Sequence, residues 1–336
     1  MVKINIANFL LTRRCNLKCD YCRISGDIDY VLKPSDYPDS EYYHKNECHI
    51  EYWIDIARLL KRNNPDVFIL IYGGEPLLKK GLDKLITYLN EQEIGYTIIS
   101  NSTPEIRSKT EELFEKVGKI RGFTSSIDPG YWLEEGDSDE KYKSREGLKF
   151  LVENTKKGLI EDPVAEITVD STNIMFLEET VQRLDALGIW SDITVIDIAK
   201  NNHYDFSSIT NPQVLVPKDI EVIELLSRLS ESKYKIHMKE LLLPMIANIL
   251  PAELHCEMGK NGVDNITIEP NGELRLCLRI RGRYTPKFNA LDILSEKKQN
   301  DVMEAMQADY ETLCDGCNWT CKLMSQLDPK IVLEHL

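Results

Sequence analysis

The chain has 336 residues and a formal net charge of −14, and 42% of its residues are hydrophobic. This length suits one large catalytic domain with a smaller companion, and the hydrophobic fraction is sufficient for a packed core. The acidic balance argues against a nucleic-acid partner, because proteins that bind phosphate backbones carry basic surfaces.

The sequence also gives no sign of a membrane segment or an export signal. No run of 18 hydrophobic residues occurs, and Arg13 and Arg14 follow the apolar start of the chain instead of preceding it. We therefore expect a cytoplasmic protein without membrane contact. Thiols stay reduced in that compartment, so the nine cysteines point to metal binding or catalysis rather than to disulfides.

The first 200 residues alternate between short apolar runs and longer stretches with helical spacing. The predicted strands are Ile4–Leu11, Val67–Tyr72, Tyr96–Ser100, Gly122–Ile127, Ala165–Val169 and Ile193–Ile198. The predicted helices are about His49–Arg62, Gly81–Asn90, Pro104–Val117, Lys141–Lys156 and Leu177–Leu187. This alternation indicates an α/β fold with a parallel sheet, which right-handed crossovers curve into a partial (β/α)6 barrel of the TIM type. The active site of such a fold lies at the carboxyl ends of the strands.

The remainder of the chain departs from this rhythm. Residues 24–43 contain two prolines and several tyrosines, and we expect an ordered loop or lid there. Beyond residue 250, Ile266–Glu269 and Glu273–Leu278 flank a Pro-Asn-Gly turn and predict a hairpin, followed by a helix near Asp292–Ala308. We expect a barrel at residues 1–200, a helical bridge at 201–250 and a small α+β domain at 251–336.

Cys15, Cys19 and Cys22 directly follow the first predicted strand, at the catalytic mouth of a barrel. Three thiolates in eight residues can wrap one metal ion or one cluster. A structural zinc site takes four ligands, and the next cysteine, Cys48, is 26 residues further on. Three ligands leave one iron of a [4Fe–4S] cluster open to a small molecule with an amine and a carboxylate. A three-cysteine zinc loop is the alternative.

This C-x3-C-x2-C spacing, with Tyr21 before the last cysteine, resembles the signature of the radical S-adenosylmethionine (SAM) superfamily. The resemblance implies that the open iron binds the methionyl part of SAM. It also implies that reduction of the cluster cleaves SAM to methionine and a 5′-deoxyadenosyl radical. Tyr21 stands where family members place a residue against the adenine.

Gly73, Gly74 and Glu75 end the second predicted strand and resemble the Gly-Gly-Glu motif of the same superfamily. The glycines permit a close approach of the backbone to a ligand, and Glu75 supplies a carboxylate acceptor for an ammonium group. The resemblance implies that this motif receives the SAM amino group. A strand-ending turn is the alternative.

Weaker marks follow the next two predicted strands. Asn101 comes after the third strand, and Ser126 and Asp128 close the fourth. They resemble positions at which relatives contact the ribose of SAM, other parts of SAM or the substrate. Each of these side chains is equally suited to capping the helix that follows.

Five cysteines fall in the last 81 residues, namely Cys256, Cys277, Cys314, Cys317 and Cys321. The pattern resembles the C-terminal extensions called SPASM and twitch domains. SPASM domains use seven cysteines for two auxiliary clusters, so five cysteines fit the twitch form with one auxiliary [4Fe–4S] cluster better. We expect the first four as its ligands. Cys321 is either a substitute for one of them or a hydrogen-atom donor to a substrate radical, and zinc is the alternative occupant.

Two further features have plainer interpretations. Cys48 stands near His44 and His49, but no fourth ligand is evident, so we expect a buried or capping role for it. The basic stretch from Arg275 to Lys287 favours either a solvated loop or contact with an anionic substrate.

The resemblance implies a radical SAM enzyme that abstracts a hydrogen atom from a peptide or peptide-like substrate, with a net oxidation or rearrangement in natural-product maturation. An electron donor such as flavodoxin or ferredoxin would reduce it. The first strand begins near Ile4, which leaves no extra module for a leader peptide and counts against a leader-dependent enzyme. A sugar or nucleotide as a small polar substrate is the alternative. A non-catalytic iron–sulfur carrier or sensor, or a zinc-stabilised adaptor, would not need the Gly-Gly-Glu motif.

Overall fold

The computed structural model describes residues 3–17, 45–132, 139–169, 173–195, 220–237, 239, 242, 265–275 and 287–313. The strands in this part of the chain are β1 (Ile6–Leu10), β2 (Phe68–Tyr72), β3 (Gly95–Ser100), β4 (Ile120–Ser126), β5 (Ile160–Val169), β6 (Trp190–Val195), β7 (Asn265–Ile268) and β8 (Leu274–Arg275). The α-helices are α2 (Ile50–Asn63), α3 (Leu82–Glu91), α4 (Pro104–Val117), α5 (Asp139–Lys156), α6 (Leu177–Ala186), α7 (Ile220–Glu231), α9 (Ala290–Ile293) and α10 (Gln299–Leu313). Two 3-10 helices, η2 (Pro76–Leu78) and η3 (Ile174–Phe176), follow β2 and β5.

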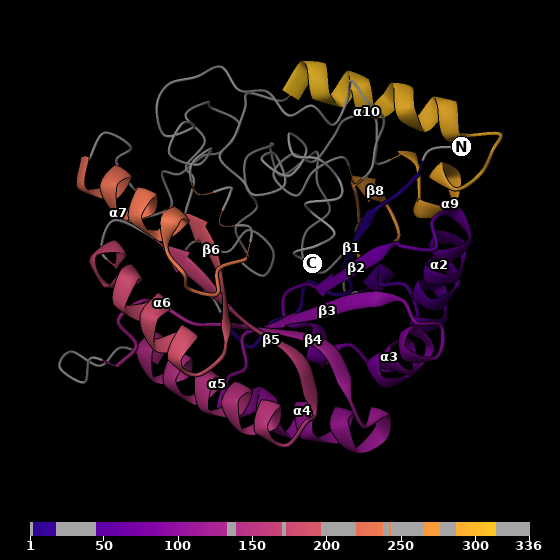
Figure 1. Cartoon of the computed structure of the whole chain (residues 1–336). Coiled ribbons are helices and arrows are strands. Elements are labelled where there is room, and N and C mark those ends of the chain that lie inside the picture. Colours follow the sequence, from indigo (N-terminus) through magenta and orange to yellow (C-terminus); the bar gives the residue numbers. More distant parts are fainter. Residues whose placement is uncertain are drawn as a thin grey trace. The chain divides into compact units, whose positions relative to one another are not determined.

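The chain divides into two compact units, and the first holds the described residues of 1–100, 108–122 and 258–314. In this unit β1 pairs in parallel with β2 on one side and with β7 on the other, and β2 pairs in parallel with β3. The antiparallel strand β8 joins β7. All five residues of β1 are buried, as expected for a central strand of a parallel sheet. Figure 1 shows β1, β2 and β3 side by side, with α2 and α3 next to each other.

The second unit holds the described residues of 101–107 and 123–257. Its strands β5 and β6 pair in parallel over six positions, from Val164 opposite Trp190 to Val169 opposite Val195. The helix α5 packs on β5, and α6 packs on β6. β4 begins in the first unit and ends in the second. Each unit therefore contains consecutive βα repeats.

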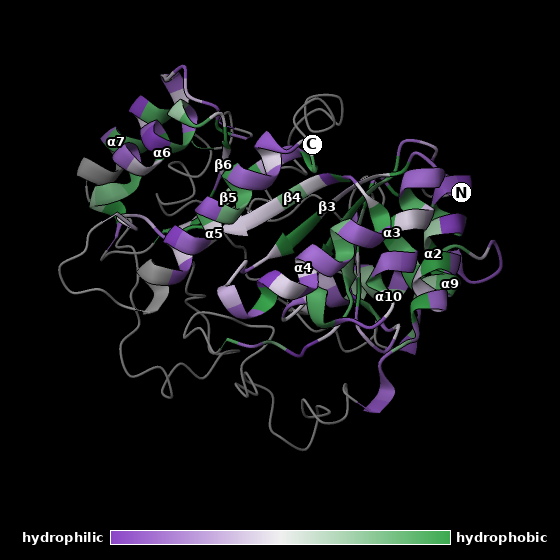
Figure 2. Cartoon of the chain, turned by 90° about the horizontal axis from the view of Figure 1, so that it is seen from below, coloured by the Kyte–Doolittle hydropathy of each residue, from purple (hydrophilic) through white to green (hydrophobic). Residues whose placement is uncertain are grey.

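The helices follow from the spacing of their apolar residues. In α2 the buried residues Ile50, Trp53, Ile56, Ala57 and Leu60 recur every three or four positions and form one stripe. Figure 2 shows that α3 and α4 also contain both hydrophobic and hydrophilic residues. Such helices bury one stripe on the sheet and expose the other face.

The six predicted barrel strands and the five helices between them are confirmed, with shifts at their ends. The largest shift is in β5, which starts at Ile160 and not at Ala165, because the exposed Glu161 and Asp162 hide its first residues from a hydrophobic pattern. The helix predicted near residues 292–308 is wrong as a single helix. It is split between α9 and α10, because the carbonyl of Ser295 accepts hydrogen bonds from Lys298 N and Gln299 N and forms a turn.

The predicted hairpin is confirmed over the described residues. Glu269 N donates to the carbonyl of Glu273, and Gly272 takes a φ of +85°, which favours glycine. β7 of this hairpin pairs with β1, so the hairpin belongs to the same unit as the barrel's first strands. The predicted boundaries at residues 200 and 250 stay a prediction. The loop at 24–43 and most of the bridge lie outside the described residues.

Within the described part of the chain, no helix is long and apolar enough to cross a membrane. The strands β1, β2 and β3 run in the same direction, so their carboxyl ends meet at one edge of the first unit. This edge brings together the segments that follow Leu10, Tyr72 and Ser100.

Candidate functional site

Cys15 is the predicted cluster ligand that the structure describes. It follows β1 closely, at the carboxyl end of that strand, and it is half-buried. The backbone N–H of Leu17 donates to its sulfur atom at 3.4 Å. Cys19, Tyr21 and Cys22 lie outside the described residues. Their roles, like that of Cys15, stay predictions.

The Gly-Gly-Glu motif lies directly against the segment that leads to Cys15. Gly74 N donates to the carbonyl of Thr12 at 2.7 Å, and Glu75 N donates to the carbonyl of Arg14 at 2.8 Å. A Cβ atom on Gly73 would stand 2.4 Å from the carbonyl oxygen of Thr12, and one on Gly74 would stand 2.3 Å from that of Arg14. The sequence predicted that these glycines admit a ligand. The structure shows that they allow a close approach of the backbone at Thr12 and Arg14, in the segment that leads to Cys15.

The carboxylate of Glu75 has protein partners at the end of β2. Its side chain is fully buried, and it accepts hydrogen bonds from Leu77 N and from the hydroxyl of Ser100, which contacts both carboxylate oxygens at 3.1 Å. These bonds fix the turn into η2 and connect the end of β2 with the end of β3. Glu75 thus helps to hold this edge of the unit together. Its contact with the SAM amino group stays a prediction.

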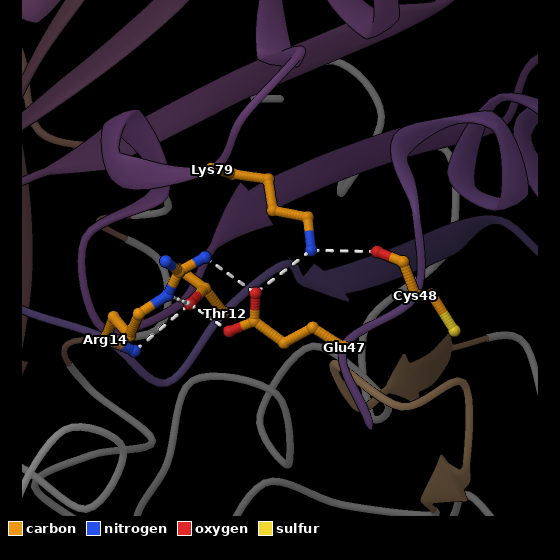
Figure 3. Close-up of polar contacts among 5 residues, drawn as sticks. All are labelled: Thr12, Arg14, Glu47, Cys48 and Lys79. Atoms are coloured by element: carbon orange, nitrogen blue, oxygen red, sulfur yellow. Dashed lines mark hydrogen bonds and ion pairs between the residues drawn. The ribbon is translucent and has the colours of Figure 1, made fainter. Parts of the chain in front are cut away.

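Glu47, which the sequence analysis did not single out, binds three side chains of the same region (Figure 3). It accepts a short hydrogen bond from the hydroxyl of Thr12, and its other oxygen lies 2.8 Å from the guanidinium of Arg14 and 3.2 Å from Nζ of Lys79. Lys79 also donates to the carbonyl of Cys48 at 2.8 Å. The side chains of Glu47 and Lys79 are only 7% and 6% exposed. We call these contacts the Glu47 network.

The surroundings of Glu47 keep it ionised. Burial alone would raise the pKa of Glu47, but the hydrogen bond from Thr12 and the charges of Lys79 and Arg14 outweigh burial and lower that pKa. The network therefore combines a carboxylate with two cations at neutral pH. No local motif marks Glu47, because its partners are 32 to 35 residues away in the chain.

A second buried carboxylate, Glu269 at the end of β7, pairs with two arginines. Its side chain is fully buried, and Arg13 reaches it at 3.0 Å while Arg275 of β8 forms a shorter ion pair with it. Arg275 is itself buried. This arginine therefore belongs to an internal ion pair and not to a solvated loop, whereas residues 276–286 of the basic stretch lie outside the described residues.

The weaker candidates make local bonds. Asn101 accepts a hydrogen bond from Thr103 N at 3.1 Å, just before α4. Asp128 accepts one from the hydroxyl of Ser144 in α5 at 3.1 Å, and its own N–H donates to that hydroxyl at 2.9 Å. Ser126 is half-buried at the end of β4. The bond of Asn101 agrees with a role at the start of α4, whereas Asp128 bonds a side chain within α5, and contacts of the three residues with SAM stay predictions.

Glu166 of β5 and Asp192 of β6 form a carboxylate pair that the sequence analysis missed. They are opposite each other in the strand register, on the face away from the buried Ala165, Ile167 and Ile193. Burial and the charge of Asp192 raise the pKa of Glu166 to about 7, and burial raises the pKa of Asp192 to about 6. An acidic residue within an apolar strand was the one available signal for such a pair.

Cys48, for which the sequence predicted a buried or capping role, is half-buried and contacts the hairpin turn. Its N–H donates to the carbonyl of Pro270, and its sulfur lies against Gly272 of the hairpin turn. Burial raises the pKa of its thiol. His49 precedes α2 without a side-chain cap bond, and His44 lies outside the described residues. In the described ranges no three His, Cys, Asp or Glu side chains are grouped to hold a metal ion.

The five C-terminal cysteines, at positions 256, 277, 314, 317 and 321, lie outside the described residues. The auxiliary cluster and the role of Cys321 therefore stay predictions.

A family model described as the Radical SAM superfamily matches residues 9–230. The chain belongs to the radical SAM superfamily. This membership implies an enzyme with a [4Fe–4S] cluster and SAM, and the matched residues include the cysteine motif and Gly73–Glu75.

Several proteins of known structure share the fold. Streptococcus suis SuiB bound to SAM matches 91% of this chain and 68% of its own, with a TM-score of 0.63 and 16% identity. SuiB is also known with its precursor peptide SuiA. The protein anSMEcpe, with bound AdoMet and the Cp18Cys peptide, matches 95% of this chain and 88% of its own, with a TM-score of 0.56 and 16% identity. These likenesses confirm the predicted α/β fold of the partial-barrel type.

The sequence relatives differ in their names and in how much of this chain they match. An uncharacterized protein of Methanocaldococcus jannaschii is 28% identical over 287 residues, 81% of this chain and 84% of the relative. GTP 3′,8-cyclase of Staphylococcus saprophyticus is 39% identical over 94 residues, which is 26% of this chain and 24% of the cyclase. A SAM-dependent nucleotide dehydratase of Selenomonas ruminantium is 27% identical over 124 residues, 36% of this chain and 39% of the relative.

Proposed function

We propose that this radical SAM enzyme binds a [4Fe–4S] cluster through Cys15, Cys19 and Cys22 and abstracts a hydrogen atom from a peptide or peptide-like substrate. The observation that carries the proposal is the direct contact between the segment that leads to Cys15 and the Gly73–Glu75 turn at the ends of β1 and β2. The superfamily match covers both motifs.

The donor set fits the proposed cluster. Three thiols within eight residues suit iron, and Cys15 is only half-buried, so its sulfur remains within reach of a ligand. When bound, the reduced cluster supplies the electron that cleaves SAM and yields the 5′-deoxyadenosyl radical. The chain's own contribution is to place and shield the reacting groups.

The residues at the ends of β2 and β3 are proposed to orient SAM. The buried side chain of Glu75, fixed by Leu77 N and Ser100, places two acceptor oxygens close to the segment that leads to Cys15. Such oxygens suit the N–H groups of an ammonium group. Asn101, Ser126 and Asp128 are proposed to contact the ribose or the substrate from the ends of β3 and β4.

A peptide substrate is supported by the fold comparison. SuiB and anSMEcpe resemble this chain over more than nine tenths of its length, and both are known with bound peptides. A nucleotide is the second candidate, because a GTP cyclase and a nucleotide dehydratase are sequence relatives, although the matches span no more than 39% of those proteins. The net reaction is proposed to be an oxidation or rearrangement, with flavodoxin or ferredoxin as electron donor.

The first experiment measures 5′-deoxyadenosine by liquid chromatography and mass spectrometry, under anaerobic conditions with dithionite and SAM. Wild-type protein is expected to form it, and Cys15→Ala is expected to form none. A peptide library and a set of nucleoside triphosphates are then added in parallel. Faster 5′-deoxyadenosine formation with nucleotides alone would replace the peptide assignment, and equal rates in wild type and Cys15→Ala would refute the proposal as a whole.

The second experiment tests the proposed auxiliary cluster on Cys256, Cys277, Cys314 and Cys317. Iron per chain is measured after anaerobic reconstitution, for wild type and for a Cys15/Cys19/Cys22→Ala triple variant. About 8 iron atoms falling to about 4 is the expected result for two clusters. A value of about 4 falling to near zero would leave the auxiliary cluster without support. Loss of the remaining iron in a further Cys321→Ala variant would make Cys321 a ligand and not a hydrogen donor.

A further inference from the structure

Glu47 contacts two chain segments of the proposed SAM site, the one that leads to Cys15 and the one that follows the Gly73–Glu75 turn. Glu47 itself belongs to neither the cysteine motif nor the Gly-Gly-Glu motif. One oxygen of its carboxylate accepts from Thr12, and the other binds the guanidinium of Arg14, the residue directly before Cys15. The second oxygen also binds Lys79, which lies just after the Gly-Gly-Glu turn and η2. The carboxylate of Glu47 thus connects the segment before Cys15 with Lys79 of the other segment.

We propose that Glu47 is a positioning residue that sets the separation between the Thr12–Cys15 segment and the Gly73–Glu75 turn. The proposal rests on the proposed function, because it assigns Glu47 a role in SAM binding at that site. Glu47 does not touch SAM or a reacting atom in this assignment. It acts through Thr12, Arg14 and Lys79.

The burial of the network gives this link its strength. Glu47 and Lys79 are almost fully buried, so removal of the carboxylate leaves the ammonium group of Lys79 in a poorly solvated position without the counter-charge of Glu47. Lys79 would move toward water, and Arg14, whose side chain is 48% exposed, would be released as well. Both movements displace segments whose backbones touch each other at Gly73 and Gly74.

A surface ion pair nearby provides a matched control. Glu51 at the start of α2 pairs with Lys84 at 3.0 Å, and both side chains are more than 60% exposed. Exposed pairs of this kind contribute little to stability. Glu51→Gln therefore makes the same chemical change four residues away without touching the Thr12–Cys15 segment.

The test compares Glu47→Gln with wild type and Glu51→Gln. Each protein is reconstituted anaerobically, its iron content is measured, and SAM is titrated while the electron paramagnetic resonance signal of the reduced cluster is followed. We expect Glu47→Gln to load iron but to bind SAM roughly tenfold more weakly, because small displacements of positioned groups have effects of this order. Glu51→Gln is expected to stay within about twofold of wild type.

Two further variants separate positioning from stability. Glu47→Gln/Lys79→Met removes the unpaired buried cation and is expected to regain thermal stability while SAM binding stays weak. If SAM binding returns together with stability, Glu47 acts only as a structural residue and the proposal is overturned. Arg14→Gln, at a half-exposed position, decides the matter if Glu47→Gln does not fold, and it is expected to weaken SAM binding roughly threefold.

The remaining outcomes are equally decisive. Wild-type SAM affinity in both Glu47→Gln and Arg14→Gln would overturn the positioning role while leaving the proposed function intact. An equal loss of SAM affinity in Glu51→Gln would also overturn the positioning role, because the effect would then not be specific to Glu47. If wild-type protein loads no iron or shows no response to SAM, the proposed function fails, and this inference fails with it.

Discussion

The contact between the cysteine segment and the Gly-Gly-Glu turn makes Gly74→Ala an informative substitution. The added methyl carbon would lie 2.3 Å from the carbonyl oxygen of Arg14 and 2.7 Å from that of Arg13. Both neighbours are backbone atoms, so no side chain can rotate away to make room. The two segments must separate.

The expected size of this effect follows from the steric clash and from the hydrogen bonds that the clash stretches. Overpacking of a close contact costs about 1–3 kcal/mol. Separation of the segments weakens the hydrogen bonds from Gly74 N to Thr12 and from Glu75 N to Arg14, which contribute about 0.5–1.5 kcal/mol each. We expect Gly74→Ala to lower the free energy of unfolding by about 2–6 kcal/mol and to reduce iron uptake on the cysteine motif.

Gly118→Ala is the matched control for this measurement. Gly118 follows α4 with a φ of +73°, and a Cβ there would have nothing within 4 Å. Its substitution should cost about 1–2 kcal/mol from the left-handed backbone alone and leave iron uptake unchanged. Urea unfolding, monitored by circular dichroism, measures the free energy of unfolding. Iron analysis after reconstitution measures the iron uptake. Equal unfolding midpoints and equal iron contents in the two variants would refute the reasoning.

Three other substitutions test the buried charges. Glu269→Gln leaves two arginines without their buried carboxylate and should cost about 3–5 kcal/mol in urea unfolding; a shift no larger than that of the exposed control Glu51→Gln would contradict this. Ser100→Ala removes the hydroxyl that contacts both oxygens of Glu75 and should cost about 1–3 kcal/mol in the same assay, so unchanged stability would argue against that bond. The folded state raises the pKa of Glu166 to about 7 from 4.5, so ionisation of Glu166 destabilises the folded protein. This destabilisation is absent below about pH 4, where Glu166 is protonated in both the folded and the unfolded state. It grows as Glu166 ionises in the unfolded state and is complete above about pH 7. Glu166→Gln should therefore raise stability at pH 8 by about 1–3 kcal/mol and have no effect near pH 4, and an equal gain at both pH values would be inconsistent with that pKa.

The fold was predictable because its signals are local. The stripe from Ile50 to Leu60 in α2 repeats every three or four residues, and the strands between the helices are short apolar runs. The motifs at Cys15 and Gly73–Glu75 are equally local. Their adjacency followed from the rule that parallel strands end at one edge of a sheet.

The partners of these motifs were not predictable, because they come from distant positions. Glu269 is 256 residues from Arg13, and Glu47 is 33 residues from Arg14. A glutamate carries no sign of which arginine it will meet, and its burial depends on the packing of the whole unit. For Gly74 the sequence indicated a close approach but not its partner, since glycine admits a ligand and a neighbouring backbone equally well.

The two buried carboxylates have a common consequence for the cysteine motif. Arg13 and Arg14 are consecutive residues directly before Cys15, yet they bind different carboxylates, Glu269 and Glu47. Each carboxylate also has a second cationic partner, which is Lys79 for Glu47 and Arg275 for Glu269. Two carboxylates from distant parts of the chain therefore fix the segment at consecutive positions directly before Cys15.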